Sequence, residues 1–349
     1  MTGHDILIIV GIMAICSGWL DIFNISLFIK KVLLGILMFC ALYAGYINFP
    51  DSADFGVYNA LYFSNASDQF VFPELKDGII DYGFLWLWTV IKSFGGDIYS
   101  AYVATCALTL FFYYISISKY TSYILTVWSF IYVRLFYTCN VIQIRQGLAM
   151  SIILVGLQYV EKKCFWKFLL FVIVASLIHK TVLVTILLYP LSMVKWNEVK
   201  IFISVAVSTV ISFLYGKEIF FFLVSAMGIG LEKLYAYEGS GYFAEASNYV
   251  MLVRGVPILL CVYYLIRMKK EKYANLFISM LLCGYLFLMV SKDLAILGRF
   301  TSTFLLCMNF IPIYLFRKCS NASNKIVVMF IISILLGTLF VKNLGVNLL

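Results

Sequence analysis

A short polar segment, residues 140–149, places Gln143, Arg145 and Gln146 between two long apolar runs. Arginine is charged at every accessible pH, and an arginine at membrane depth costs roughly 2.5–3.5 kcal/mol on insertion scales. A chain that keeps such a group usually has an anion for it to bind, and the planar guanidinium matches phosphate or carboxylate oxygens. The alternative is a structural arginine that snorkels to an interface or caps a neighbouring helix. Arg145 is the first candidate for contact with an anionic substrate.

Four further cationic or titratable side chains stand beside apolar runs in separated parts of the chain. They are His179, Lys180, Arg254 and Arg299. Each has a simpler explanation alone, since Arg299 could anchor a helix at the membrane interface and His179 could cap a helix end. Together with carboxylates they would suit a cavity in which cations bind phosphate and acids transfer protons.

The composition identifies the elements that must position these residues. The chain has 349 residues, of which 63% are hydrophobic and 12% charged, with a mean hydropathy of +0.98. A soluble domain has about 45–50% apolar and about 25% charged residues. The sequence therefore predicts an all-α, polytopic membrane protein with one integral membrane domain over residues 1–349. The first apolar run lacks a basic n-region and a cleavage site, so we expect no cleaved signal peptide.

Neither the charge nor the cysteines indicate another class. The net charge of +9 would suit nucleic-acid binding, but most of the 26 Lys and Arg residues lie in short breaks between apolar runs. That pattern is typical of cytoplasmic loops. The nine cysteines show no CxxC pair and no metal-ligand spacing with histidine, so most read as small buried hydrophobes. We expect no nucleic-acid partner, no cofactor and no required metal ion.

The apolar runs predict about twelve spans, because a span needs about 20 mostly apolar residues. The runs cover residues 5–23, 32–48, 98–117, 123–142, 144–160, 165–178, 182–194, 201–215, 251–266, 275–290, 300–316 and 326–341. The shorter stretch 82–95 contains Trp86 and Trp88. We interpret it as an interfacial or re-entrant helix, because tryptophan favours the headgroup level.

Two long acidic segments, residues 49–81 and 216–248, contrast with the short basic breaks. By the positive-inside rule the basic breaks face the cytoplasm, and the acidic segments form outer loops with both termini outside. This topology brings the cations and the histidine named above to the outer face. The Arg145 side chain would then face an aqueous cavity, and its loss should leave the fold intact.

Four motifs in the chain resemble elements of the EpsG family. In chain order they are Asp51-Ser-Ala-Asp54-Phe-Gly-Val-Tyr58, Asp81-Tyr-Gly-Phe84, the block from Ile144-Arg145-Gln146-Gly147-Leu148-Ala149 to Ala175-Ser-Leu-Ile-His179-Lys180, and Gly298-Arg299-Phe300. The block from Ile144 to Lys180 is the most specific. Asp81 departs from the pattern, since the family more often has glutamate there. The resemblance extends over roughly residues 45–315.

The resemblance implies a bacterial polysaccharide polymerase of the Wzy type, related to the C-type glycosyltransferases. Such an enzyme joins oligosaccharide repeat units, carried on undecaprenyl pyrophosphate, at the outer face of the inner membrane. Its product would be O-antigen, capsule or exopolysaccharide. Its partners would be the lipid-linked oligosaccharide and the bilayer, and could include a chain-length regulator and a flippase.

Within that reaction the cations and amides would bind substrate. Arginine forks match the oxygens of a leaving pyrophosphate, so Arg145 and Arg299 are the first candidates for that contact. Arg254 and Lys180 are further candidates. Tyr58, Gln143 and Gln146 are candidate substrate contacts beside them.

The acceptor hydroxyl would need a general base. Asp54 is our first choice, with Asp81, Asp51 and His179 as alternatives. Asp51 and Asp54 lie three residues apart and could share one helical face. They could instead form a solvated loop with a helix N-cap or hold a divalent metal, for which two carboxylates alone are weak support.

Two other classes of protein stay open. A flippase or transporter of lipid-linked sugars would also use buried ionisable residues, but usually shows repeated halves and broken helices. We detect no such repeat in the sequence. A membrane acyltransferase acting on glycans would need a catalytic histidine, and His179 is the only histidine outside the extreme N-terminus.

Overall fold

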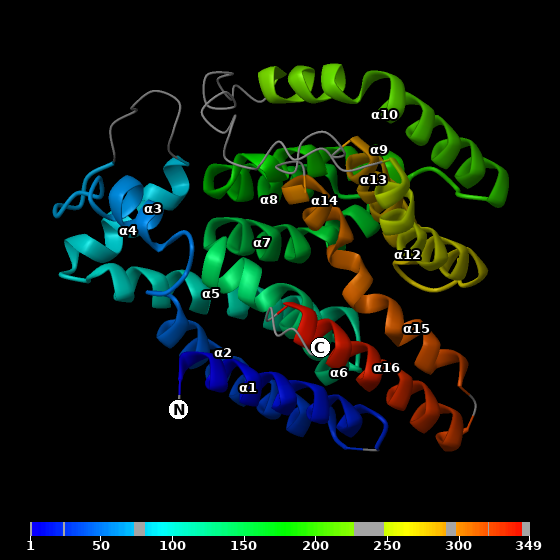
Figure 1. Ribbon diagram of the computed structural model, residues 1–349, viewed down its shortest axis with the longest axis horizontal. Helices are drawn as coiled ribbons and strands as arrows, with labels where there is room; N and C mark the ends of the chain where they lie inside the picture. Colours follow the sequence, from blue (N-terminus) through cyan, green and yellow to red (C-terminus); the bar gives the residue numbers. More distant parts are fainter. Residues whose placement is uncertain are drawn as a thin grey trace.

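The computed structural model describes residues 2–23, 25–72, 81–226, 248–290, 298–319 and 321–343, and every regular element in these ranges is helical. The predicted all-α class is therefore confirmed. A lipid environment offers the backbone no hydrogen bonds, so a chain this apolar must satisfy its N–H and C=O groups within helices. Most of the long helices run side by side across the view in Figure 1.

The chain begins with a helical hairpin, α1 (Gly3–Gly18) and α2 (Leu27–Asn48), at the bottom of Figure 1. Thr2 and Ser26 cap the two helices by accepting hydrogen bonds from backbone N–H groups in their first turns. In the connection, a short 3₁₀ turn η1 (Trp19–Asp21) brings Asp21 to 3.2 Å from the ammonium of Lys30.

The predicted first outer loop is partly helical. It contains α3 (Phe55–Tyr58) and a π-helical turn η2 (Asn59–Phe63), and it leads into α4 (Tyr82–Ser93). These elements gather at one end of the bundle, on the left of Figure 1. Stretch 82–95 is thus a separate short helix, and its placement at the membrane surface remains a prediction.

The centre of the bundle is formed by consecutive helices that reverse direction at short turns. They are α5 (Ile98–Tyr120), α6 (Ile124–Ile131) continued by the π-helical η3 (Tyr132–Ile142), α7 (Ile144–Glu161), α8 (Phe165–Ile178), and η4 (Lys180–Leu187) continued by α9 (Leu188–Ser192). Helix α7 lies between α5 and α8 and is buried along almost its whole length. A helix that is apolar on every side can be buried in this way.

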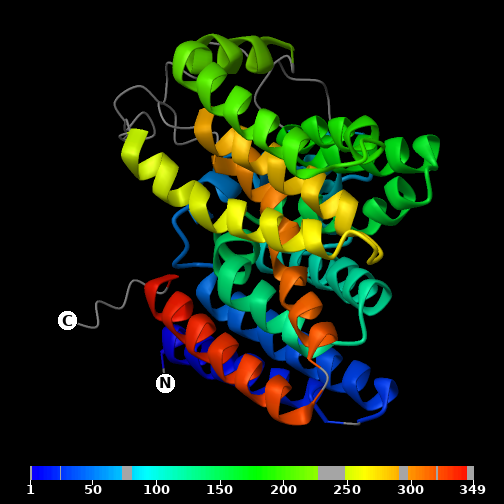
Figure 2. The same cartoon turned by 90° about the vertical axis from the view of Figure 1, so that its right-hand side faces the viewer.

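The C-terminal part completes the bundle. It contains α10 (Glu198–Ala226), α12 (Asn248–Arg267), α13 (Ala274–Val290), α14 (Gly298–Phe304) continued by η7 (Leu305–Phe310) and α15 (Ile311–Lys318), and α16 (Ala322–Asn343). Helix α10 continues to Ala226, past a kink at Tyr215, so the start of the predicted second outer loop is helical. Residues 227–247 of that loop lie outside the described ranges. Figure 2 shows α10, α12 and α13 in the upper part of the molecule and the blue α1–α2 hairpin at the bottom, with the orange segment of α14 and α15 running down between them.

Eight helices in the described ranges are long and apolar enough to cross a membrane. Three shorter apolar helices accompany them, at Phe165–Ile178, Lys180–Ser192 and Ala274–Val290. Large apolar side chains such as Phe28, Trp166 and Phe202 are more than 70% exposed, as expected of surfaces that contact lipid. The chain is therefore a multi-pass membrane protein, and the count of about twelve spans remains a prediction.

Candidate functional site

The polar segment with Arg145 forms a tight turn between two helices. Helix η3 ends at Ile142 and α7 begins at Ile144, so only Gln143 separates them. Gly147 permits this approach, because a Cβ there would lie 1.9 Å from the carbonyl oxygen of Cys139. The close packing places Arg145 in the first turn of α7, at the same end of the bundle as α3 and α4.

A second glycine brings α4 against the end of α8. A Cβ on Gly83 would lie 2.8 Å from the Cβ of Leu177 and 3.0 Å from its backbone carbon. Asp81 precedes α4 and His179 follows α8, so this contact brings the two together. Nδ1 of His179 lies 3.6 Å from Oδ2 of Asp81.

Arg145 is held by three neighbours from the first acidic segment. Its Nη1 donates to Oδ2 of Asp81 at 2.6 Å and also donates to the hydroxyl of Tyr62. Its Cζ lies 4.7 Å from the ring centre of Tyr62 and 5.8 Å from that of Tyr58, within the range of cation–π attraction. Nε of Arg145 is buried and has no hydrogen-bond partner among the described residues. The guanidinium is thus firmly oriented while keeping a donor unused.

The two carboxylates at the site differ in their electrostatics. Burial raises the pKa of Asp54 above its ordinary value, although the charges of Arg299 and Arg145 act against burial. Burial also disfavours the charged form of Asp81, but the contacts with His179 and Arg145 outweigh it and hold the pKa of Asp81 below its ordinary value. Asp81 is therefore an ionised counterion of Arg145, whereas Asp54 is the more basic carboxylate. In enzymes, such a difference in pKa lets one carboxylate transfer protons while the other stays ionised and stabilises charge.

These residues surround a small polar cavity of about 10 Å³, which is room for about one water molecule. Its lining residues are Asp54, Tyr58, Gln143, Arg145, Gln146, His179 and Arg299. Gln146 also donates from Nε2 to the carbonyl oxygen of Arg299 at 2.9 Å, which ties the start of α14 to α7. Separate parts of the chain thus meet at one end of the bundle (Figure 1).

The structure separates the predicted site residues into three groups. Seven of them line the cavity. Asp81 is not a lining residue, but it contacts two residues that are, Arg145 and His179. Asp51, Lys180 and Arg254 are not among the lining residues, and Asp51 and Arg254 are exposed.

Tyr62 is a contact residue that the sequence analysis did not single out. It is almost fully buried, and burial raises the pKa of its hydroxyl to about 12, so the group stays protonated. The signal in the sequence is its position four residues after Tyr58, which places both rings on one helical face. The ring centres of Tyr58 and Tyr62 are 6.0 Å apart.

A bundle of membrane-length helices with an ion-paired arginine and a second carboxylate at one end defines a multi-pass membrane protein with a small polar cavity. The chain belongs to the EpsG family, which matches over residues 30–348, nearly its whole length. That family consists of Wzy-like polysaccharide polymerases. No match was found among curated proteins or among solved structures.

Proposed function

We propose that this protein joins oligosaccharide repeat units, carried on undecaprenyl pyrophosphate, into a surface polysaccharide. The observation that carries the proposal is the meeting of Asp54, Arg145 and Arg299 around one cavity. Transfer of a glycosyl unit from a lipid pyrophosphate needs a base for the attacking hydroxyl and cations for the leaving group. Both kinds of group are present within this one cavity.

In the proposed reaction the acceptor hydroxyl of one repeat unit attacks the anomeric carbon of another. The new glycosidic bond forms as the bond between that carbon and the pyrophosphate oxygen breaks. The hydroxyl proton passes to Asp54, whose raised pKa suits proton acceptance. The electron pair leaves with undecaprenyl pyrophosphate, whose added negative charge Arg145 and Arg299 would stabilise.

Arg145 and Arg299 would contribute differently. Arg145 is already paired with Asp81, so part of its charge is neutralised and its remaining donors act as oriented hydrogen bonds. The Arg299 guanidinium has no acidic partner within ion-pair distance among the described residues. We therefore assign the larger share of the pyrophosphate charge to Arg299. Since the cavity admits only one hydroxyl or phosphate oxygen, substrate binding would require the side chains around it to move.

We further propose about twelve membrane passes, with the site on the outer side of the bacterial inner membrane. Eight membrane-length helices, the three shorter apolar helices and the buried α7 would account for twelve. Three of the basic turns, after α5, between α12 and α13 and after α15, lie together, since Tyr123 stacks on Phe316 and the Tyr314 hydroxyl donates to the carbonyl oxygen of Lys272. They lie at the end of the bundle away from α3 and α4 (Figure 1). The positive-inside rule would place that basic end in the cytoplasm and the site outside.

The test is to follow lipid-linked repeat units in a deletion strain that carries either the wild-type gene or an Asp54→Asn variant. A polymerase defect should leave single repeat units on the outer leaflet and no long chains. Single units retained on the inner leaflet would indicate a flippase, and normal chains lacking acyl groups would indicate an acyltransferase. Either result would overturn the proposed reaction.

A further inference from the structure

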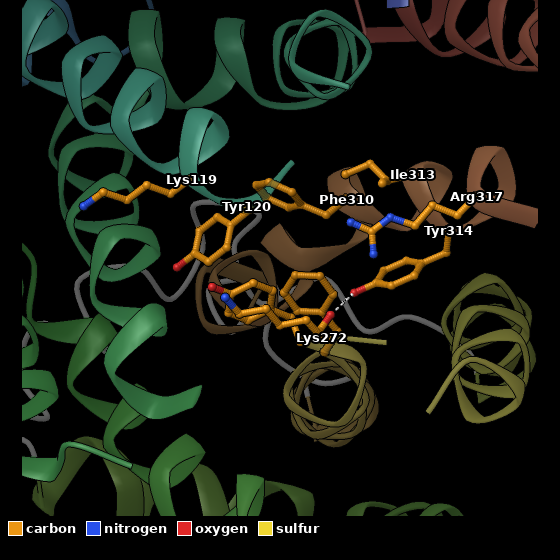
Figure 3. A pocket seen from close by; sticks show the side chains of 9 residues that line it. Lys119, Tyr120, Lys272, Phe310, Ile313, Tyr314 and Arg317 are labelled. Atoms are coloured by element: carbon orange, nitrogen blue, oxygen red, sulfur yellow. Dashed lines mark hydrogen bonds between the residues drawn. The ribbon is translucent and has the colours of Figure 1, made fainter. Parts of the chain in front are cut away.

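A second polar cavity, of about 70 Å³, lies at the end of the bundle opposite the candidate site. It is enclosed by the ends of α5 and α15, the turn between α12 and α13, and η7. Its lining residues are Lys119, Tyr120, Lys272, Tyr273, Phe277, Phe310, Ile313, Tyr314 and Arg317. Figure 3 shows these side chains converging from separate helices. None of them takes part in the function proposed above.

The floor of this cavity consists of buried aromatic rings. The ring of Tyr120 meets that of Tyr273 edge-on at 4.8 Å and that of Phe310 at 5.5 Å. The Tyr314 hydroxyl donates to the carbonyl oxygen of Lys272 at 2.8 Å, the dashed line in Figure 3. This hydrogen bond fixes the turn between α12 and α13 against α15. The floor is therefore a packed surface of fixed shape.

The rim of the cavity is cationic. Lys272 and Arg317 reach over the rings, with Lys272 Nζ 5.0 Å from the ring centre of Tyr273 and Arg317 Cζ 5.8 Å from that of Tyr314. Lys119 lies on the far side of the rim, and its ammonium points away from the floor in Figure 3. Arg317 is ion-paired with Glu271, but no acid lies within ion-pair distance of Lys119 or Lys272 in the described part of the chain. The rim therefore has cationic groups left for an external anion.

The backbone at Tyr273 supports a functional role for this cavity. Its φ is +67°. This left-handed conformation is uncommon for residues other than glycine, and for a bulky residue it is an outlier. Such a conformation persists only where the surrounding structure holds it. Here it directs the Tyr273 ring onto the aromatic floor directly after Lys272, so one turn supplies both a wall and a cation.

We propose that this cavity binds the phosphate group of an anionic membrane lipid such as phosphatidylglycerol. A volume of about 70 Å³ holds about five water-sized groups, which matches the five heavy atoms of one phosphate and is too small for a nucleotide. The cavity lies at the ends of apolar helices, where headgroup phosphates are found. Basic pockets between transmembrane helices are suited to such headgroups. Free phosphate has the same chemistry, and the experiment below separates the two sources.

The experiment places the full-length protein in nanodiscs of phosphatidylcholine, with or without phosphatidylglycerol, and counts the retained phosphatidylglycerol by native mass spectrometry. Lys272→Gln should weaken retention about fivefold, because one lysine near a charged lipid surface contributes about that factor. Lys270→Gln is the matched control, since it removes the same charge from the same turn without lining the cavity. Glu271→Gln should strengthen retention, because it removes the competing carboxylate from Arg317.

Three outcomes decide the matter. The lipid site is supported if Lys272→Gln retains less phosphatidylglycerol than the wild type, Glu271→Gln retains more, and Lys270→Gln retains the same amount. Equal losses for Lys270→Gln and Lys272→Gln show only general attraction to an anionic surface and overturn the site. If inorganic phosphate displaces phosphatidylglycerol completely from the wild type and also binds the protein in phosphatidylcholine discs, the ligand is a free anion and the lipid assignment is wrong.

Discussion

Arg145 and Asp81 form a mostly buried ion pair, with 2.6 Å between Nη1 and Oδ2 and with 19% and 10% of the two side chains exposed. The expectation that Arg145 stands free in an aqueous cavity is therefore wrong, and we now expect the loss of Arg145 to affect folding. Removing one partner of such a pair leaves an uncompensated charge in a poorly hydrated place. Arg145 thus has a structural role beside the catalytic role that we propose.

We expect Arg145→Ala to lose both stability and activity, and the addition of Asp81→Asn to restore only stability. The single variant should lose about 3 kcal/mol of folding free energy, because Asp81 is left unpaired. The double variant should recover folded protein yet polymerise about 100- to 1000-fold more slowly, since an oriented donor to the leaving group is missing. Thermal melting in detergent and chain-length ladders measure the two effects. Long polymer from the double variant would leave Arg145 a structural role only.

As the pH is lowered, polymerisation should be lost at a higher pH than we would expect for a general base with the ordinary pKa of aspartate. A general base must be ionised to accept a proton, and the pKa of Asp54 is raised by burial. The kcat/KM profile on lipid-linked repeats should fall as the pH drops through that raised pKa. Asp54→Asn should remove the activity at every pH. Asp54→Glu should keep activity, but its kcat/KM profile should fall at a different pH from that of the wild type. An unshifted profile in Asp54→Glu would point to another base, such as His179.

Asp54→Asn and Asp81→Asn should change thermal stability in opposite directions at neutral pH. The pKa of Asp54 is raised in the folded state, so its ionised form disfavours folding and the amide should hold or raise the Tm. The pKa of Asp81 is lowered, so its charge stabilises the fold above the unfolded pKa, and that stability is lost as the pH falls through the folded value. Asp81→Asn should therefore lower the Tm at neutral pH, with the difference vanishing in acid. Equal shifts for both variants would contradict this assignment.

Gly147→Ala should destabilise the protein by about 1–3 kcal/mol, the range for forcing an extra group into a packed interior. The added Cβ would lie 1.9 Å from the Cys139 carbonyl oxygen, which is backbone and cannot move alone. Gly35→Ala is the matched control, because a Cβ added at Gly35 would meet nothing within 4 Å. The control should melt at or slightly above the wild-type temperature, since alanine favours helix over glycine. Similar losses in both variants would show that the clash is not the cause.

Single cysteines should report the side of the membrane on which the site lies. In a background without native cysteines, Gln69→Cys should react with an impermeant thiol reagent in intact spheroplasts. Lys270→Cys should react only after permeabilisation. Both positions are exposed. Gln69 follows η2, in the segment that leads to α4, and Lys270 lies in the turn between α12 and α13; in Figure 1, α4 and the α12–α13 pair lie on opposite sides of the bundle. The reverse pattern would move the site to the cytoplasmic side and exclude periplasmic polymerisation.

The sequence alone determined the class of the protein and most of the cavity. Hydropathy is a local property, so apolar runs identified the helices before any packing was known. Arg145, His179 and Arg299 were candidates because each interrupts or borders an apolar run. Asp54 was a candidate general base within a motif that resembles the EpsG family, and all four residues line the cavity. Their roles in catalysis remain proposals.

Only the tertiary structure decided which candidates meet. Arg145 and Asp81 are 64 positions apart in sequence. Their contact depends on two close helix approaches that glycine permits, where Gly147 packs against Cys139 and Gly83 against Leu177. No local pattern encodes those approaches, because they arise from the packing of α7 on η3 and of α4 on α8. The same packing excludes Asp51 and Arg254 from the cavity, since their exposure depends on which faces the neighbouring helices cover.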